Sequence, residues 1–366
     1  MSHPQEGDIL AGKYRIDRVL GVGGMGMVVS ALHLQLHEQV AIKFLLPVAL
    51  ANPEAVARFA REARAAVKIK SEHIARVADV GALEGGAPYM VMELLRGSDL
   101  SVALHEGGPL PPWLAALYVL QACEALAEAH ALGMVHRDLK PANLFFTSRA
   151  DGSPCVKVLD FGISKLRSLG NSGTNLAVTR TQAIMGSPLY MSPEQMANPR
   201  DVDARSDIWA VGTVLYELVT GRVPFEAESV PQLCTLILHH DPVPPRALRP
   251  DLPTGFQDII LRCLRKDRAQ RYANVAQLAA DLAAYAPDAG PLSAERISRV
   301  LSGSFAATEL ASSHYPSPSA ASSSAGSQAW SFAPPARSLR LSFRSVSSAC
   351  WSHAGWVCCY RAPDRP

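Results

Sequence analysis

The chain of 366 residues is long enough for one large domain with an appendage, or for two moderate domains. Its 35 basic and 33 acidic residues give a formal charge of +2, too even a mixture for a nucleic-acid-binding surface. Seven cysteines without a CxxC pair, no signal-peptide pattern and no apolar run of about 18 residues predict a cytoplasmic protein without a membrane span.

Short β-type runs dominate the N-terminal part of the chain. The runs Tyr14 to Leu20, Met27 to Leu34 and Val40 to Leu45 predict an antiparallel meander. Asn52-Pro53 is the pattern of an N-cap followed by the first helical residue, and the apolar stripe from Val56 to Val67 predicts a helix. Two further runs, at 74–80 and 89–94, complete a small β-rich lobe.

The pattern becomes helical after Gly97. Apolar residues between Leu114 and Ala129 follow helical spacing and predict a buried helix. Further helices are predicted at about 203–220, 229–239, 256–265 and 274–285, and a long loop at 160–200 has the length of a functional segment. Residues 310–366 hold fifteen serines and only seven Leu, Ile, Val or Phe. We therefore expect order to end near Tyr285 and the tail to be disordered.

Glycines cluster between the first two predicted strands of the meander. Residues 21–28 read GVGGMGMV and fit GxGxxGxV. Glycines let backbone N–H groups approach phosphate oxygens without an intervening side chain. A flexible hairpin or a dinucleotide-binding turn would show the same glycines. The β-type residues that follow favour a hairpin that covers phosphates.

A lysine and a glutamate in the same lobe form a candidate ion pair. Lys43 lies on a predicted strand among apolar neighbours, where a buried ammonium needs an anionic partner. Glu62 lies three residues after Phe59, beside the buried stripe of its helix. The alternatives are an outward-facing lysine and a solvated helix carboxylate.

The segment HRDLKPANL, residues 136–144, is followed by DFG at 160–162. Asp138 could take the proton of an acceptor hydroxyl, and Lys140 could neutralise charge on a transferred phosphoryl group. Asn143 and Asp160 offer the oxygen ligands that magnesium requires. This pair of motifs predicts phosphoryl transfer.

At these motifs the chain resembles the protein kinase superfamily, specifically the eukaryotic-like serine/threonine kinases of bacteria. The resemblance implies an α+β bilobal kinase domain over residues 9–286. A small antiparallel β-rich lobe with one key helix would extend to about residue 95, and a larger, mainly helical lobe would cover 96–286. Residues 1–8 would be an extension and 287–366 a Ser/Ala/Pro-rich tail.

The resemblance also implies a site for ATP with Mg²⁺, or Mn²⁺ as an alternative. In it Met92 corresponds to the gatekeeper, Glu93 to Leu95 to the hinge, and Asp99 to the ribose contact. Val28, Ala41, Met92 and Phe145 would enclose the adenine. The residues implied around the nucleotide are Leu20, Gly21, Val22, Gly23, Gly24, Met25, Gly26, Met27, Val28, Ala41, Lys43, Glu62, Met92, Glu93, Leu95, Asp99 and Phe145.

Residues 186–195, GSPLYMSPEQ, resemble the segment that docks a protein acceptor. Ser187 stands where the family has the threonine that, with Lys140, marks serine/threonine kinases. Ser192 stands where the family more often has alanine, and Glu194 would pair with Arg271. Asp207 resembles the helix aspartate that braces the catalytic loop.

Arg137, beside the candidate base, suggests a regulatory hypothesis. A phosphate on Thr179 or Thr181 could pair with this arginine and order the loop at 163–190. The alternative is that both are ordinary loop threonines.

The predicted activity is transfer of the γ-phosphoryl group of ATP to protein serine and threonine, and a dimer of two kinase domains is a candidate assembly. An ATP-binding pseudokinase is an alternative, although Lys43, Asp138 and Asp160 are all present. A small-molecule phosphotransferase of related fold is another, although such enzymes tend to lack the acceptor-docking segment. The tail, which ends in ACWSHAGWVCCYRAPDRP, is explained equally by a truncated or frame-shifted remnant and by a natural disordered tail.

Overall fold

The computed structural model describes residues 5–22, 26–83, 86–160, 188–198 and 201–303. All of them fall in the first of the chain's two units, Met1–His314. The second unit, Tyr315–Pro366, lies outside the described residues. The disorder predicted for residues 310–366 also concerns residues that the structure does not describe.

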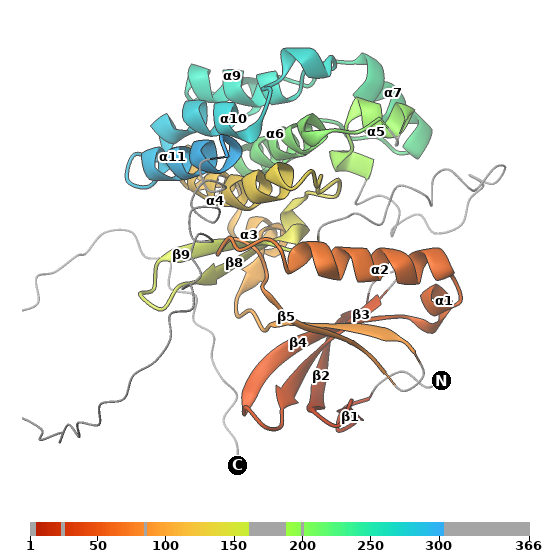
Figure 1. Ribbon diagram of the computed structural model, residues 1–366. Helices are drawn as coiled ribbons and strands as arrows, with labels where there is room; N and C mark the ends of the chain where they lie inside the picture. Colours follow the sequence, from red (N-terminus) through yellow and green to blue (C-terminus); the bar gives the residue numbers. More distant parts are fainter. Residues whose placement is uncertain (1–4, 23–25, 84–85, 161–187, 199–200, 304–366) are drawn as a thin grey trace, which may run out of the picture. The chain divides into compact units, whose positions relative to one another are not determined.

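A six-stranded antiparallel sheet forms the N-terminal lobe (Figure 1). The strand order is β1-β2-β3-β4-β6-β5. Strands that follow one another in the sequence are neighbours in the sheet, except β4 and β5, which are separated by β6. Helix α2 lies between this sheet and the helical part of the structure (Figure 1). The elements are β1 (Ile9–Leu10), β2 (Tyr14–Val22), β3 (Gly26–His33), β4 (Glu38–Leu45), α1 (Pro47–Leu50), α2 (Pro53–Ala66), β5 (Val77–Ala82) and β6 (Pro88–Glu93).

The two faces of this sheet have different roles. Alternating side chains on one face form a hydrophobic cluster that includes Val29, Ile42 and Val91. The opposite face carries Lys43, whose partner across the ladder is Met90. Phe59 and Ala63 of α2 pack on Met90. The packing of α2 therefore covers the face of the sheet that carries Lys43.

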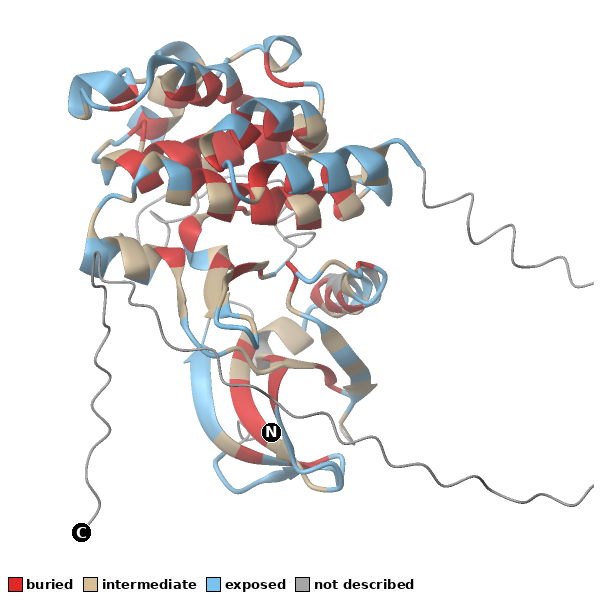
Figure 2. Cartoon of the chain, turned by 90° about the vertical axis from the view of Figure 1, so that its left-hand side faces the viewer, coloured by how far each residue is buried: buried red, intermediate tan, exposed pale blue. Residues whose placement is uncertain are grey.

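The C-terminal lobe is mainly helical, with one small sheet of order β7-β8-β9. Figure 2 shows that buried residues concentrate at the centre of this helical part. Helix α6 is buried at every position from Ser206 to Tyr216, as expected of a helix surrounded by others. The elements are β7 (Ser98–Asp99), α3 (Leu100–Gly107), α4 (Pro112–Ala131), β8 (Leu144–Ser148), β9 (Pro154–Val158), α5 (Pro193–Ala197), α6 (Ala204–Thr220), α7 (Val230–His239), α8 (Pro245–Leu248), α9 (Thr254–Cys263), α10 (Val275–Leu282) and α11 (Gly290–Leu301).

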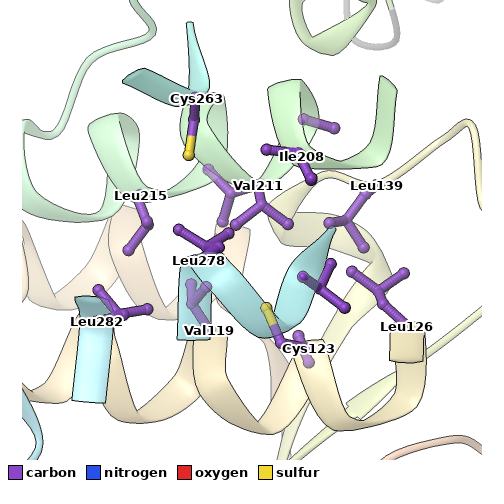
Figure 3. Close-up of a cluster of buried hydrophobic side chains, with 14 of the residues drawn as sticks. Val119, Cys123, Leu126, Leu139, Ile208, Val211, Leu215, Cys263, Leu278 and Leu282 are labelled. Carbon is purple, nitrogen blue, oxygen red and sulfur yellow. The ribbon is translucent and has the colours of Figure 1, made fainter. Parts of the chain in front are cut away.

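Side chains from α4, α6 and α10 meet in the core of this lobe (Figure 3). Val119, Val211 and Leu278 represent the three helices there. Leu139, which follows the candidate base Asp138, reaches into the same core and is buried. The core thus anchors the loop on which Asp138 lies. Among the described residues, no helix is both long and apolar enough to span a membrane.

The predicted fold class is confirmed, with three corrections. The strand predicted at 74–80 begins only at Val77, and Ile74 forms an isolated parallel bridge with Val158 instead. Val67, predicted within the buried stripe of α2, follows the end of the helix and is 55% exposed.

The third correction concerns the end of the ordered chain. Order was expected to end near Tyr285, but α11 follows and packs against α4 and α10. Ile297 of α11 is fully buried, and Ser293 donates a hydrogen bond to Glu124 Oε1 of α4 at 2.5 Å. Ala294, Ile297, Val300 and Leu301 do form an apolar stripe at helical spacing, but this stripe follows a turn at residues 286–289, beyond the point where order was expected to end.

Candidate active site

Lys43 and Asp160 meet between the two lobes. Lys43 Nζ lies 2.6 Å from Asp160 Oδ1, and the two side chains are 19% and 53% exposed. Asp160 follows β9 by two residues and has a backbone φ of +45°. A positive φ is costly for a residue other than glycine and is typical of functional sites. The strained backbone directs the Asp160 carboxylate toward Lys43.

The segment 136–138 is held by hydrogen bonds to its backbone. Arg137 has a φ of +66°. The backbone N–H groups of His136 and Arg137 donate to Asp207 Oδ2 and Oδ1, both at 2.8 Å. Asp207 lies in the first turn of α6 and is fully buried. Burial alone would raise the pKa of its carboxyl, but the hydrogen bonds with His130 and with the Arg137 N–H lower that pKa, so the group is charged.

His136 connects this segment to the residues before Asp160. Asp138 N–H donates to His136 Nδ1 at 3.3 Å, and His136 Nε2 lies 3.0 Å from the carbonyl oxygen of Leu159. Burial lowers the pKa of His136, which favours the neutral ring. A proton on Nε2 satisfies both contacts, since Nε2 can then donate to Leu159. The candidate base and the candidate metal ligand Asp160 are thus linked through one imidazole.

Asp138, Lys140 and Asn143 form a hydrogen-bonded group. Lys140 Nζ lies 3.2 Å from Asp138 Oδ2. Asn143 Nδ2 donates to the Asp138 carbonyl oxygen at 2.7 Å and to Asp138 Oδ2 at 3.2 Å. The backbone carbonyl oxygen of Asn143 in turn accepts a hydrogen bond from the backbone N–H of Leu159 at 2.8 Å. The predicted catalytic residues Asp138, Lys140 and Asn143 therefore lie together, joined to the strand end that carries Asp160.

The donor groups at this site fit a magnesium ion. Asp160 supplies an exposed carboxylate, and the Asn143 amide nitrogen is occupied by Asp138, which leaves the amide oxygen as its ligand atom. Among the described residues, no three His, Cys, Asp or Glu side chains group as a metal site. An ion held here would depend on Asp160, Asn143 and substrate phosphates, as Mg²⁺ sites often do.

The glycine loop is described only in part. Gly21 and Val22 end strand β2 and are exposed, and Gly23, Gly24 and Met25 lie outside the described residues. A Cβ at Gly26 would lie 2.5 Å from the Phe44 carbonyl oxygen, so this glycine is required by the close approach of β3 and β4. A Cβ at Gly21 would meet no atom within 4 Å. Packing therefore gives no reason for glycine at position 21.

Three of the residues predicted around the adenine share the sheet face of Lys43. Val28 pairs with Lys43 in the ladder, and Ala41 pairs with Met92. Phe145 comes from β8, opposite Asp99 of β7. A cavity of about 30 Å³ lies beside Lys43, Met92 and Asp160. That volume suits about one water molecule.

The predicted hinge and ribose residues have structural contacts of their own. Glu93 Oε1 accepts from Arg76 N and Lys157 Nζ, both at 2.7 Å. Asp99 is the N-cap of α3, where its Oδ1 accepts from Ser101 N at 2.9 Å and from Val102 N at 3.1 Å. Leu95, in the connection between β6 and β7, is half-buried, and Leu20 at the end of β2 is exposed. The roles of these residues toward a nucleotide stay predictions.

Several predicted residues lie outside what the structure describes. The backbone of Glu62 belongs to α2, but its side chain is not described, so its pairing with Lys43 stays a prediction. Ser187, Thr179 and Thr181 also lie outside the described residues.

The segment that follows Ser187 is fastened to the helical lobe. Tyr190 donates to Glu217 Oε2 at 2.6 Å. Glu194 makes a two-pronged contact with Arg271, with Nη1 to Oε1 at 2.7 Å and Nη2 to Oε2 at 2.8 Å, which matches the predicted pairing. Two polar anchors of the catalytic loop, His130 and Gln195, were not predicted. Ser192 and Gln195 have the spacing of a capping box, but this pattern does not indicate the contact with Arg137, and no local motif marks His130.

Comparisons with known proteins agree with this geometry. A family model described as "Protein kinase domain" matches residues 14–282. The chain is 40% identical over 280 residues to serine/threonine-protein kinase pkn3 of Myxococcus xanthus, covering 76% of this chain and 51% of that protein. It is 38% identical over 276 residues to serine/threonine-protein kinase PknB of Mycobacterium tuberculosis, covering 75% of this chain and 43% of that protein.

A solved structure has the same fold. The kinase domain of Mycobacterium tuberculosis PknI is 28% identical, with a TM-score of 0.59, and the match covers 77% of this chain and all of that one. The chain spans about half the length of the curated relatives that it matches, 51% and 43% for the two named above. Their similarity therefore concerns one domain.

Proposed function

The chain belongs to the protein kinase family, and from this premise we propose that it transfers the γ-phosphoryl group of ATP to serine and threonine hydroxyls of proteins. The observation that carries the proposal is the linked group of Asp138, Lys140 and Asn143, joined to Asp160 and Lys43 between the lobes. Phosphoryl transfer depends mainly on positioning and on stabilising charge. This group supplies two carboxylates, Asp138 and Asp160, and two cations, Lys43 and Lys140.

Each residue has a chemical role in the proposed reaction. Asp138 orients the acceptor hydroxyl and takes its proton as the oxygen attacks. Lys140 and Lys43 hold negative charge on the phosphoryl oxygens. Asp160 and Asn143 would hold a magnesium ion, which would supply further positive charge to the phosphates. The contact between Lys43 and Asp160, at 2.6 Å, places both side chains where phosphates and their metal ion would bind.

The acceptor class is argued from the docking segment and from the relatives. The sequence retains Ser187 and the residues up to Gln195, and the matched relatives are named serine/threonine-protein kinases. Ser187 would line the acceptor pocket together with Lys140. These features favour a protein hydroxyl over a small-molecule acceptor.

A labelling assay tests the proposed function. The full chain, incubated with γ-labelled ATP and Mg²⁺, should label serine and threonine peptides in a library and leave matched tyrosine peptides and free small alcohols unlabelled. The Asp138→Asn variant, prepared in the same way, controls for contaminating kinases. Transfer to small alcohols alone, or no transfer by the wild type, would overturn the proposal.

Activation by phosphorylation of the loop is a second part of the proposal. No ion pair of the Arg137 guanidinium occurs among the residues that the structure describes, and burial lowers its pKa. A phosphate on Thr179 or Thr181 would supply an anionic partner. Mass spectrometry after incubation with ATP and Mg²⁺ should find phosphate on one of these threonines. A fully active preparation without phosphate on either would refute this regulation.

Three further expectations stay predictions. The cytoplasmic location and the domain limits 9–286 rest on sequence patterns, and a kinase dimer rests on resemblance. The origin of the tail also stays a prediction, and its residues from 304 onward lie outside the described part of the chain.

A further inference from the structure

Gln195 contacts the catalytic loop from the first turn of α5. Its side chain is buried, with the residue 8% exposed. Gln195 Oε1 accepts from Ser192 N and from Ser192 Oγ, both at 3.1 Å, and Nε2 donates to the Arg137 carbonyl oxygen at 2.9 Å. Because two donors hold the amide oxygen, the amide nitrogen must face Arg137. Ser192 thus sets the orientation of Gln195.

The contact completes the support of a strained peptide unit. Arg137 has a φ of +66°, a conformation that persists only when its surroundings hold it. Asp207 of α6 holds the backbone N–H of Arg137, and Gln195 of α5 holds its carbonyl oxygen. The next residue is Asp138. The direction of the peptide between Arg137 and Asp138 therefore decides where the Asp138 carboxylate lies.

Capping alone does not explain Gln195. Ser192 and Gln195 form a capping box at the start of α5, in which the side chain of Gln195 uses only its oxygen. Glutamate serves a capping box equally well. The capping box does not use the Nε2 group of Gln195, and this group donates to Arg137. The contact with Arg137 therefore requires an amide at position 195, whereas the cap alone would also accept glutamate.

We propose that Gln195, oriented by Ser192, is a positioning residue for phosphoryl transfer. It holds the peptide that places Asp138, and it joins this peptide to residues 188–195, the described part of the acceptor-docking segment. This inference rests on the proposed function and deepens it. With alanine at position 192 the hydroxyl contact would be absent, and the backbone N–H of residue 192 alone would orient the Gln195 amide.

Replacing Gln195 with glutamate separates the two roles. The introduced carboxylate keeps the cap but loses the donor, and it places a charged oxygen against the Arg137 carbonyl. Near pH 8 we expect kcat to fall about tenfold, with KM for ATP unchanged. Near pH 6 the protonated carboxyl can donate to Arg137, so much of the loss should be recovered. Burial, Asp207 across the Arg137 peptide and Glu194 raise the pKa of the new group, while Arg271 and the Arg137 guanidinium oppose that shift.

Three comparisons make the result decisive. Gln277→Glu, at an exposed cap position whose Oε1 accepts from Ala273 N, should keep wild-type kcat at both pH values. Gln195→Met, which cannot donate at any pH, should lose activity equally at both. Thermal unfolding curves should show that all three variants are folded at the assay temperature. The inference is overturned if kcat of Gln195→Glu is close to that of the wild type, or if its loss of kcat does not depend on pH. The proposed function would stand in either case. An inactive wild type overturns the proposed function itself.

Discussion

Replacing Asp138 with asparagine should lower kcat by about 10²- to 10⁴-fold and leave the affinity for ATP nearly unchanged. The asparagine side chain has almost the same shape, so the hydrogen bond from Asn143 to the Asp138 backbone oxygen should persist. The amide, however, cannot take the proton of an acceptor hydroxyl. It also places no negative charge beside Lys140 Nζ, which lies 3.2 Å from Asp138 Oδ2. Binding and chemistry should therefore separate in this variant.

Steady-state transfer to a serine peptide, with ATP binding followed by calorimetry, measures both quantities. The matched control is Asp251→Asn. Asp251 is an exposed carboxylate that pairs with Arg249 at 3.3 Å on the surface of the helical lobe. This control should retain wild-type kcat, since an exposed ion pair contributes little. If Asp138→Asn transfers phosphate within a few-fold of the wild type, Asp138 is not the base.

The fold was predictable where hydrophobic periodicity is strong. The stripe from Leu114 to Ala129 predicted a buried helix, and α4 covers Pro112–Ala131. The short β-type runs between Tyr14 and Leu45 predicted an antiparallel meander, and β2, β3 and β4 pair in that way. The motif at 136–144 predicted a group of chemically linked side chains because each residue type has a role in phosphoryl transfer. Hydrophobic periodicity thus predicted the two lobes, and the chemistry of the motif residues predicted the candidate site.

Specific polar contacts between distant residues were not predictable. Gln195 and Arg137 are 58 residues apart, and their contact depends on a strained carbonyl that no sequence pattern displays. Helix α11 was missed although Ile297, Val300 and Leu301 lie at helical spacing on its packed face. The contacts that fix its position come from small and polar residues. A Cβ at Gly290 would lie 2.5 Å from the Ala283 carbonyl oxygen, and Ser293 donates to Glu124.

Asp99 is a further residue whose contacts in the structure were not predicted. The resemblance assigned its carboxylate to the ribose, whereas in the structure Oδ1 caps α3. A short polar residue before a helix is also the signature of an N-cap. One residue can satisfy both patterns, and only the coordinates show the capping contact.

Replacing Arg271 with methionine should lower the free energy of unfolding by about 3–5 kcal/mol. The Arg271 side chain is 0% exposed and contacts both carboxylate oxygens of Glu194. It also donates to the backbone oxygens of Arg265, Arg205 and Lys266. Methionine fills much of the space but leaves Glu194 buried without its cation. Urea denaturation followed by circular dichroism measures the change.

The control is the same substitution at an exposed arginine. Arg262 is 47% exposed, lies 3.7 Å from Asp281 and stacks over the Tyr272 ring at 4.1 Å, so Arg262→Met should cost about 1 kcal/mol. Adding Glu194→Gln to Arg271→Met should recover part of the loss, because the buried charge is then removed. A loss in Arg271→Met no larger than that in Arg262→Met would show that the pair does not stabilise the lobe.

The loss in Arg271→Met should also depend on pH. In the wild type, burial opposes ionisation of Glu194, but the contacts with Arg271 lower its pKa below the usual value. A lowered carboxyl pKa contributes stability above the unfolded-state pKa, and this contribution is lost as pH falls through the folded-state value. Without Arg271, burial alone should raise the pKa of Glu194, and the variant should lose stability as pH rises. The difference between wild type and variant should therefore be largest near pH 8 and shrink toward pH 5, whereas a cavity effect alone would be the same at both.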